Sequence, residues 1–232
     1  MKKNLKIMLS VLLFGMFMLS ISNVYAEDEF EAAQNKKKAE VKATITKKMT
    51  DNFKTTKLYK KILDTEKRRL AWVEKNEMYI KDLAKSDAKY EKFKDLYFEI
   101  KKCLFENFNP DRALAAADEA LAIKDMSYIH YLKSVAYCLK NDLNNVIAES
   151  EKVDEEIRPV CAYYYMTLGN AKHQTGDIEG AKKAFKEGVE KAPDREIFED
   201  MAVFYEAIGD KKSYEENKKI ALTLFAIICM GY

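Results

Sequence analysis

Apolar side chains recur at three- and four-residue steps through the second half of the chain, the spacing that places side chains on one face of a helix. The clearest stretch covers residues 162–194, and Gly176-Asp177 interrupts it near the middle. Glycine tolerates the left-handed backbone of a helix end, and aspartate can accept hydrogen bonds from the free amides of the next helix. Pro193 cannot continue a helix. The pattern therefore predicts two short amphipathic helices folded back on each other.

Small residues at Gly169 and Ala181 would allow these two helices to approach closely. Tyr165, Leu168 and Phe185 would fill the space around the contact. A helix pair of this length has an apolar face that it cannot bury alone, so it needs neighbours of the same kind. We therefore expect a stack of such pairs.

The residues of this stretch resemble a known repeat family. The matching positions are Leu168-Gly169-Asn170-Ala171, Gly176-Asp177, Ala181, Phe185 and Pro193. At these spacings the stretch resembles the tetratricopeptide repeat, whose period is about 34 residues. Two positions depart from the family pattern, because Lys172 stands where an aromatic residue is common and Gly188 where alanine is common.

Weaker copies of the pattern lie on both sides, with turns at Gly209-Asp210, Asn141-Asp142 and Asn109-Pro110-Asp111. The resemblance extends from about Lys94 to the C-terminus. It implies an all-α, TPR-like helical repeat solenoid of about four helix-turn-helix units within a repeat domain at 87–232. The expected units are 94–126, 127–161, 162–194 and 195–232.

The N-terminal residues have the order of a secretory signal peptide. Three lysines open the chain, an apolar run follows from Ile7 to about Val24, and the small residue Ala26 precedes an acidic stretch. We expect cleavage after Ala26, so that residues 1–26 are removed and no transmembrane segment is left. The run is close to the length of a membrane span, so an uncleaved anchor is the alternative. Either way the protein is expected to be exported, to the periplasm or outside a bacterial cell.

Residues 27–86 form a lysine-rich segment of mixed charge without proline or glycine. Residues 27–55 have few large apolar side chains and predict a fraying helix or a disordered lead. Residues 56–85 predict a helix with one apolar stripe, made of Leu63, Leu70, Val73, Ile80 and Leu83, with Trp72 and Tyr79 beside it. This helix either packs on the first repeat or forms a short coiled coil that oligomerises the protein. Ser86 and Asp87 are typical of an N-cap that opens the next helix.

The charge of the mature chain argues against nucleic acid as a partner. The signal peptide contains three lysines and no acidic residue, so 37 of the 40 basic residues and all 38 acidic ones lie in the mature chain. Nucleic-acid binding would need a concentrated basic surface. Near-neutrality and export both argue against it.

The resemblance also implies a concave face lined by the first helix of each unit. The candidate partner-binding residues on it are Phe98, Lys102, Phe105, Tyr128, Tyr131, Tyr163, Met166, Asn170 and His173. In the fourth unit the corresponding positions are Glu199, Val203 and Glu206, so the groove would be aromatic in the middle and acidic toward its C-terminal end. Tyrosines exposed there would suit an extended segment or helix of a protein partner. Alternatively, they are packed between repeats with only their hydroxyls in water.

Asn170 stands where some members of the family hold a C-terminal carboxylate of a peptide. Met166 and Thr167 replace the basic residues that such a clamp needs, so we do not expect one.

No feature of the sequence indicates catalysis, a cofactor or a metal. His130 and His173 fall in different units, and neither a Ser/His/Asp arrangement nor a glycine-rich phosphate loop appears. The four cysteines lie within apolar helical pattern. Cys103 and Cys138 are the one pair considered for a disulfide, and buried free thiols are the alternative.

The C-terminal run of thirteen residues from Ile220 is apolar but too short to span a bilayer. It would fold into the fourth unit, expose an apolar strip for self-association or a partner, or contact a membrane surface. Together these features predict a non-enzymatic protein-binding scaffold or adaptor. The alternative is a structural envelope protein that assembles with itself through its N-terminal helix or its apolar C-terminus.

Overall fold

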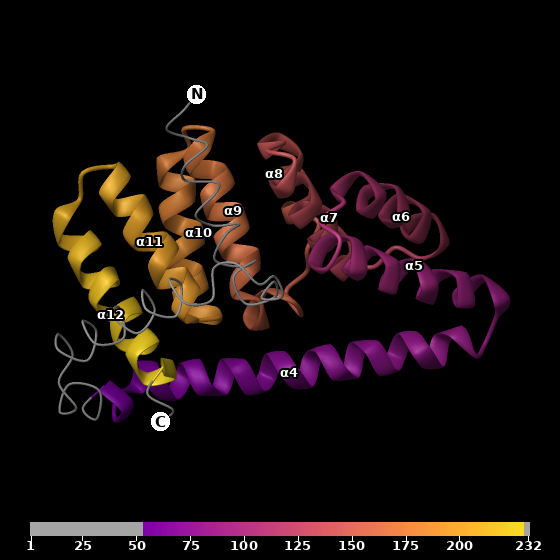
Figure 1. The fold of residues 1–232 in the computed structure, drawn as a ribbon, viewed down its shortest axis with the longest axis horizontal. Helices are drawn as coiled ribbons and strands as arrows, with labels where there is room; N and C mark the ends of the chain where they lie inside the picture. The colour runs from indigo at the N-terminus through magenta and orange to yellow at the C-terminus, as the bar shows by residue number, and fades with distance from the viewer. Residues whose placement is uncertain (1–52, 230–232) are drawn as a thin grey trace, which may run out of the picture. The chain divides into compact units, whose positions relative to one another are not determined.

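The computed structural model describes residues 53–229, and all regular structure in that range is helical, which confirms the all-α class (Figure 1). The predicted signal peptide at 1–26, most of the expected lead at 27–55 and residues 230–232 lie outside the described residues. Lys54–Ala221 form one compact unit, and the described residues from Leu222 onward belong to a second. In the part of the chain that the structure describes, no helix is both long enough and apolar enough to cross a membrane.

A single long helix, α4 at Lys57–Ala84, forms most of the segment expected to be helical at 56–85. The side chain of Thr56 caps it by accepting a hydrogen bond from the backbone amide of Tyr59 at 3.2 Å. The helix packs against α5, at Ala88–Phe105, and against the 3-10 turn η1, at Arg158–Val160. The helix therefore packs on α5, in the stretch where the first repeat was expected.

The apolar stripe predicted for α4 is wrong in its first half, although its later member Ile80 is completely buried as expected. Leu63 and Leu70 are 46% and 56% exposed, whereas the buried positions are Thr65, Ile80 and Ala84. One side of the helix is covered, and polar or aromatic side chains such as Thr65 and Trp72 lie on that side. Hydrophobicity alone therefore selected the wrong face for the first half of α4.

Among the remaining helices, three consecutive pairs are in contact, and two more helices follow them along the chain, counted here as the fourth pair. They are α5 with α6 (Pro110–Ile123), α7 (Ser127–Leu139) with α8 (Leu143–Glu151), α9 (Ala162–Gln174) with α10 (Ile178–Lys191), and α11 (Arg195–Ala207) followed by α12 (Lys211–Cys229). One pair falls within each unit expected from the sequence, except that α5 begins at Ala88, ahead of residue 94. The apolar run from Ile220 is helical as far as Cys229.

The same turn chemistry joins the helices of three pairs. The second residue after the end of the first helix has a left-handed backbone, at Asn141 (φ 59°), Gly176 (φ 89°) and Gly209 (φ 80°). The aspartates that follow, Asp142, Asp177 and Asp210, each accept a hydrogen bond from the backbone amide three residues further on. In the first pair Asn109 caps α6 and Pro110 occupies its first turn. The predicted turns are therefore confirmed, as is the Asp87 cap of α5.

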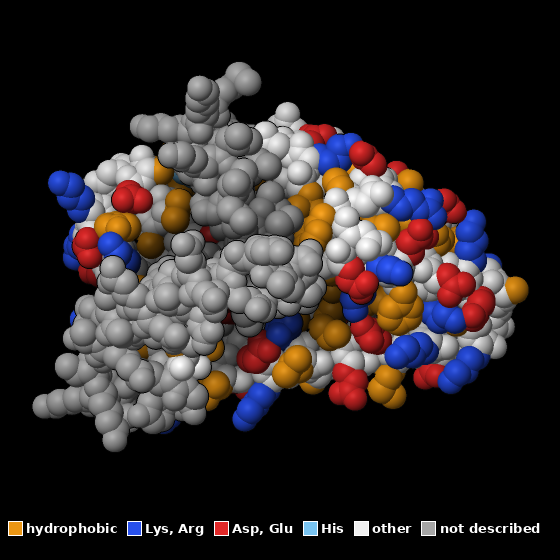
Figure 2. All heavy atoms as spheres, in the orientation of Figure 1, with side chains coloured by type: hydrophobic (Ala, Val, Ile, Leu, Met, Phe, Trp, Pro, Cys, Tyr) orange, Lys and Arg blue, Asp and Glu red, His pale blue; other side chains and the backbone are white. Residues whose placement is uncertain are grey.

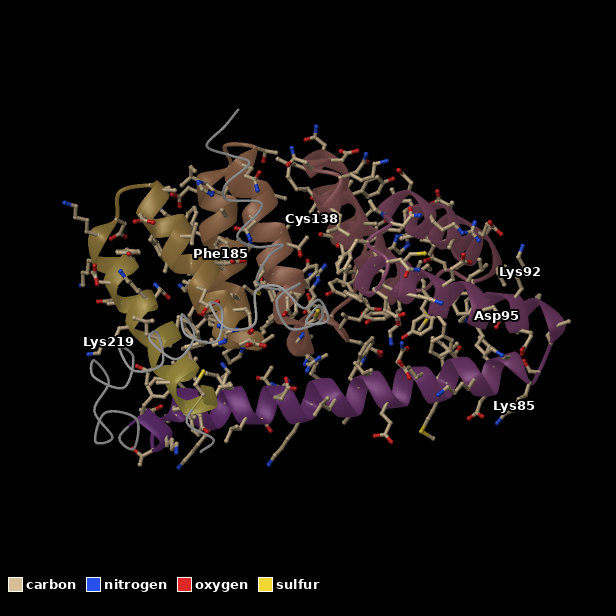
Figure 3. All side chains as sticks on the ribbon, viewed as in Figure 1. Lys85, Lys92, Asp95, Cys138, Phe185 and Lys219 are labelled. Atoms are coloured by element: carbon tan, nitrogen blue, oxygen red, sulfur yellow. The ribbon has the colours of Figure 1, made fainter. Side chains whose placement is uncertain are left out.

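Close helix packing in the third pair depends on two glycines. A Cβ atom at Gly169 would lie 2.8 Å from the Phe185 ring, and one at Gly188 would lie 2.2 Å from Ile197 Cδ1 and 2.7 Å from Tyr165 Cβ. Figure 3 shows Phe185 among these helices, where it is completely buried. Gly188 has no room for a methyl group, because Tyr165 and Ile197 occupy that space.

Successive pairs meet through their first helices, since α5 contacts α7, α7 contacts α9, and α9 contacts α11. The second helix of each of the first three pairs also contacts the first helix of the next pair. The helices α5, α7, α9 and α11 therefore lie in a row, and the candidate binding residues lie on them.

Candidate partner-binding face

Helix α4 covers two of the predicted partner contacts. The rings of Trp72 and Tyr128 lie 5.0 Å apart between their centroids, and Lys81 Nζ lies 5.8 Å from the centroid of the Phe98 ring. Such spacings are typical of aromatic packing and of cation–π contacts. Phe98 and Tyr128 therefore pack against α4 of the same chain, whereas the alternative interpretation of the stripe expected packing between repeats.

Basic side chains attach α4 to the later pairs. Arg68 Nη1 donates to the backbone oxygen of Pro159 at 3.1 Å, and the Lys61 ammonium donates to the backbone oxygen of Glu190. Glu190 lies in the last turn of α10, where unpaired carbonyls and the helix dipole favour a cation. One helix thus contacts the first pair through α5 and the third pair through the end of α10 (Figure 1).

Two further candidates belong to the core. Tyr131 and Met166 are both buried. Burial raises the pKa of the Tyr131 hydroxyl well above its usual range, and its hydrogen-bond partner is the thiol of Cys161. The Tyr131 ring also stacks on Tyr128, with 5.5 Å between centroids. These side chains support the array and offer little surface to a partner.

Three candidates are exposed. Lys102 and Phe105 lie near the end of α5, and Tyr163, in the first turn of α9, is 44% exposed. The structure does not bring all nine candidates into one groove. It separates the end of α5 from the part of the row formed by α9 and α11.

A buried carboxylate, which the sequence prediction missed, lies between α9 and α11. Asn170 Nδ2 donates to Asp200 Oδ2 at 2.7 Å, and Asp200 is only 9% exposed. Burial raises the pKa of Asp200 to about 7, and the charges of Glu199 and Glu196 add to this shift. The hydrogen bond from Asn170 acts in the opposite direction and lowers the pKa. A carboxylate set among Ile197, Phe198, Met201 and Ala202 was the signal that could have revealed it.

Cys138 of α7 also lies near Asp200, and His173 of α9 lies against a ring of α11. Burial raises the pKa of Cys138 to about 11, and the charge of Asp200 adds to this shift. Figure 3 shows Cys138 where α7 faces α9. His173, one turn after Asn170, lies edge-on to Phe204 with 5.0 Å between ring centroids, and burial lowers its pKa. Three helices therefore converge near one acidic group.

A separate ion network joins α6, α7 and α8. The side chain of Glu149 is 7% exposed, and its oxygens lie 2.6 Å from His130 Nδ1, 3.2 Å from Lys133 Nζ and 3.0 Å from Lys152 Nζ. Lys133 also pairs with Asp118 of α6 at 2.7 Å. Every charge in this network has a partner of opposite sign, so its role is to fix these helices together.

The two histidines therefore have different surroundings. His130 belongs to the Glu149 network, and His173 packs on the Phe204 ring. No group of three or more possible metal ligands occurs among residues 53–229. All four cysteines lie in that range as free thiols, so the Cys103–Cys138 disulfide considered from the sequence is not formed.

A scan against protein-family models finds no match to this chain, and a search of curated proteins finds none that is similar to it. The tetratricopeptide-repeat assignment therefore depends on the residue pattern described above. The functional argument likewise depends on the geometry of this chain.

Proposed function

We propose that the protein is a non-enzymatic binding scaffold for another protein, built as a TPR-like solenoid and exported from a bacterial cell. The recurring left-handed turns with their aspartate caps support the repeat architecture. The row formed by α5, α7, α9 and α11 supports it too, because in repeat arrays each unit packs mainly on its neighbours. Export is supported by the signal-like N-terminal sequence.

The binding surface is the side of α9 and α11 that carries Tyr163, Asn170, Glu199, Asp200 and Val203, named here the acidic face. Tyr163 precedes Asn170 by two turns on α9, and Val203 follows Asp200 by one turn on α11, so the members of each pair share a side of their helix. Val203 is 41% exposed. The observation that carries the proposal is that these large apolar side chains stay exposed beside a buried carboxylate.

The surface in Figure 2 agrees with a protein partner better than with a nucleic acid. Where the described residues are visible, basic and acidic side chains are interspersed with apolar ones, and no large basic patch appears on that face. A nucleic-acid site would show a continuous basic stripe.

The proposal is tested by affinity capture with the full chain, tagged and expressed in its own cells. The parent is compared with a Tyr163→Ala/Val203→Ser variant and with Phe105→Ala, which removes an exposed aromatic from the end of α5. We expect a protein that the parent and the Phe105→Ala variant retain and the double variant loses, with circular dichroism unchanged in all three. Equal retention by all three would exclude the acidic face as the binding surface.

Self-assembly is the second candidate function, and the outer side of α4 favours it. Leu63 and Leu70 lie one heptad apart and expose about half of their surface. Sedimentation velocity of the parent and of a Leu63→Ser/Leu70→Ser variant tests this idea. A parent oligomer that dissociates in the variant would support self-assembly, whereas a parent that stays monomeric at all concentrations would exclude it.

A further inference from the structure

We infer that the acidic face binds an arginine side chain of the partner, with the guanidinium placed on Asp200 and Asn170 and the neighbouring apolar residues of the partner on Tyr163 and Val203. This inference rests on the proposed binding function and adds the chemical class of the segment that is bound. Four properties of the face support it: an unpaired carboxylate, a second acceptor beside it, the excess of acidic groups, and exposed apolar side chains.

The carboxylate of Asp200 has one unused oxygen. Its Oδ2 accepts the hydrogen bond from Asn170, and among the described residues no donor is bonded to Oδ1. Asp200 keeps 9% of its surface exposed, and a ligand atom would approach the carboxylate through this part. The cation on the same helix, Arg195, is held by Glu196 and Glu199 instead.

A charged group that is nine-tenths buried without a counter-ion is unusual, because burying an unpaired charge is costly. Folding alone does not require this charge, since the surrounding positions Ile197, Met201 and Ala202 are apolar. A cation supplied by a partner would remove the cost, which turns an unfavourable feature of the free protein into binding energy.

Asn170 provides the second acceptor. Because its Nδ2 donates to Asp200, its side-chain carbonyl oxygen is left as an acceptor beside the carboxylate, and within the described part of the chain it has no bonded donor. A guanidinium carries five donors in a flat fork and can serve two adjacent acceptors, whereas an ammonium is a compact point charge. The pair therefore favours arginine over lysine.

The groups that face Asp200 add negative and neutral character. They are Asn170 from α9, Cys138 from α7, and Glu196 and Glu199 from α11 itself. Glu206 is a further exposed carboxylate on α11. A cationic segment is attracted to such a surface and an acidic one is repelled.

Binding of a cation must be linked to ionisation of Asp200, which is half complete near pH 7. Below that pH most of the carboxyl groups are neutral and a guanidinium gains little. The affinity for an arginine ligand should therefore rise roughly tenfold from pH 5.5 to pH 7.5 and then level off.

The test uses two short synthetic probes, acetyl-Leu-Arg-Leu-amide and the same peptide with citrulline, which has nearly the shape of arginine without its charge. Binding to the full chain is followed by NMR through the side-chain amide signal of Asn170. We expect the arginine probe to bind about ten times more tightly than the citrulline probe at pH 7.5, and the difference to become small at pH 5.5. Equal affinities at pH 7.5, or a preference that does not change with pH, would overturn the inference.

Two variants make the test specific. Asp200→Asn keeps the shape and hydrogen-bonding capacity of the side chain and should abolish the preference for arginine. Glu151→Gln removes an exposed charge from α8, outside the acidic face, and should change the preference less than twofold. A preference retained in Asp200→Asn, with the NMR spectrum showing a folded protein, would contradict the inference. If capture still depends on Tyr163 and Val203 while arginine is not preferred, only the inference fails and the binding function stands.

Discussion

Gly188 illustrates how one missing methyl group sets the distance between helices. Replacing a helical glycine by alanine normally stabilises a helix by about 0.5–1 kcal/mol. At this position the added Cβ would lie 2.2 Å from Ile197 and 2.7 Å from Tyr165, and both of these side chains are buried. The third and fourth pairs would have to separate, and overpacking of this kind costs about 1–3 kcal/mol.

Gly188→Ala should therefore lower the free energy of unfolding by about 2 kcal/mol. Urea unfolding followed by circular dichroism measures the change. Lys186→Ala, an exposed substitution in the same helix, is the control and should stay within about 0.5 kcal/mol of the parent. A more stable Gly188→Ala variant would show that the helices can adapt without cost.

Asp200 should make the folded protein less stable as the pH rises. The folded pKa is raised from 3.8 to about 7. A raised pKa gives a stabilising contribution that is complete below the unfolded value and is lost as the pH rises through the folded value. Asp200→Asn removes this dependence, so the variant should be more stable than the parent at pH 8 by up to about 3 kcal/mol and should differ little from it near pH 4. Parallel stability profiles of parent and variant would mean that Asp200 is already ionised and solvated at low pH.

Glu149 should have the opposite dependence on pH. Burial alone would raise its pKa, but the hydrogen bond with His130, helped by Lys152 and Lys133, lowers it. A lowered pKa gives stability that is present above the unfolded value and is lost as the pH falls through the folded one.

Glu149→Gln should cost about 2–4 kcal/mol at pH 7, because it leaves the buried ammonium of Lys133 with fewer partners, and the cost should shrink below about pH 4. Thermal unfolding at several pH values provides the measurement. Glu151→Gln, an exposed carboxylate at the end of α8, is a matched control for loss of charge. A loss that does not depend on pH would indicate a packing effect instead.

At the scale of the helix, the parts of the fold that depend on local chemistry are those the sequence could predict. The turns at Gly176 and Gly209, the Asp87 cap and Pro110 are all set by neighbours in the chain. The presence of each helix could also be predicted, because amphipathic spacing and capping residues act within a few residues of the chain.

The features of the fold that depend on contacts between residues far apart in the sequence could not be predicted in this way. The orientation of α4 is set by the ring contact of Trp72 with Tyr128 and by the hydrogen bond from Arg68 to Pro159. Leu63 and Leu70 therefore lie on the exposed side of the helix. Periodicity gives the direction in which side chains point from one helix, but not which neighbour will cover them. For this reason Phe98 and Tyr128 were expected at a binding groove and are instead covered by α4.

The contact between α4 and α7 can be followed through Trp72, the one tryptophan of the chain. Tyr128→Ala should shift the Trp72 emission to longer wavelength and roughly double its quenching by acrylamide, because the partner ring is removed and water enters. Tyr163→Ala removes a tyrosine from the acidic face and should leave the emission unchanged. An unaltered spectrum in Tyr128→Ala would mean that α4 is held in place without this ring contact.

At the scale of the whole molecule, α4 connects the first pair with the third, which is not its neighbour along the chain. In a repeat array each pair packs mainly on its neighbours, so stability is close to a sum of local terms and the array can unfold in parts. Helix α4 contacts α5 in the first pair. It also contacts η1, which leads into the third pair, and the end of α10, which belongs to the third pair. Separating one end of the unit Lys54–Ala221 therefore strains contacts at the other.

This arrangement predicts that the parent unfolds in urea as one transition, with Trp72 fluorescence and circular dichroism coincident. In Lys61→Ala/Arg68→Ala the attachments of α4 to Glu190 and Pro159 are lost, while its contact with α5 is kept. The third pair can then open independently of the first, so the two signals should separate and the apparent m-value should fall by roughly a quarter. Lys67→Ala, an exposed lysine on the same helix, serves as the control and should keep the signals coincident. If the double variant also unfolds in one step with an unchanged m-value, the cooperativity of the array comes from contacts between neighbouring pairs, and α4 only covers their side chains.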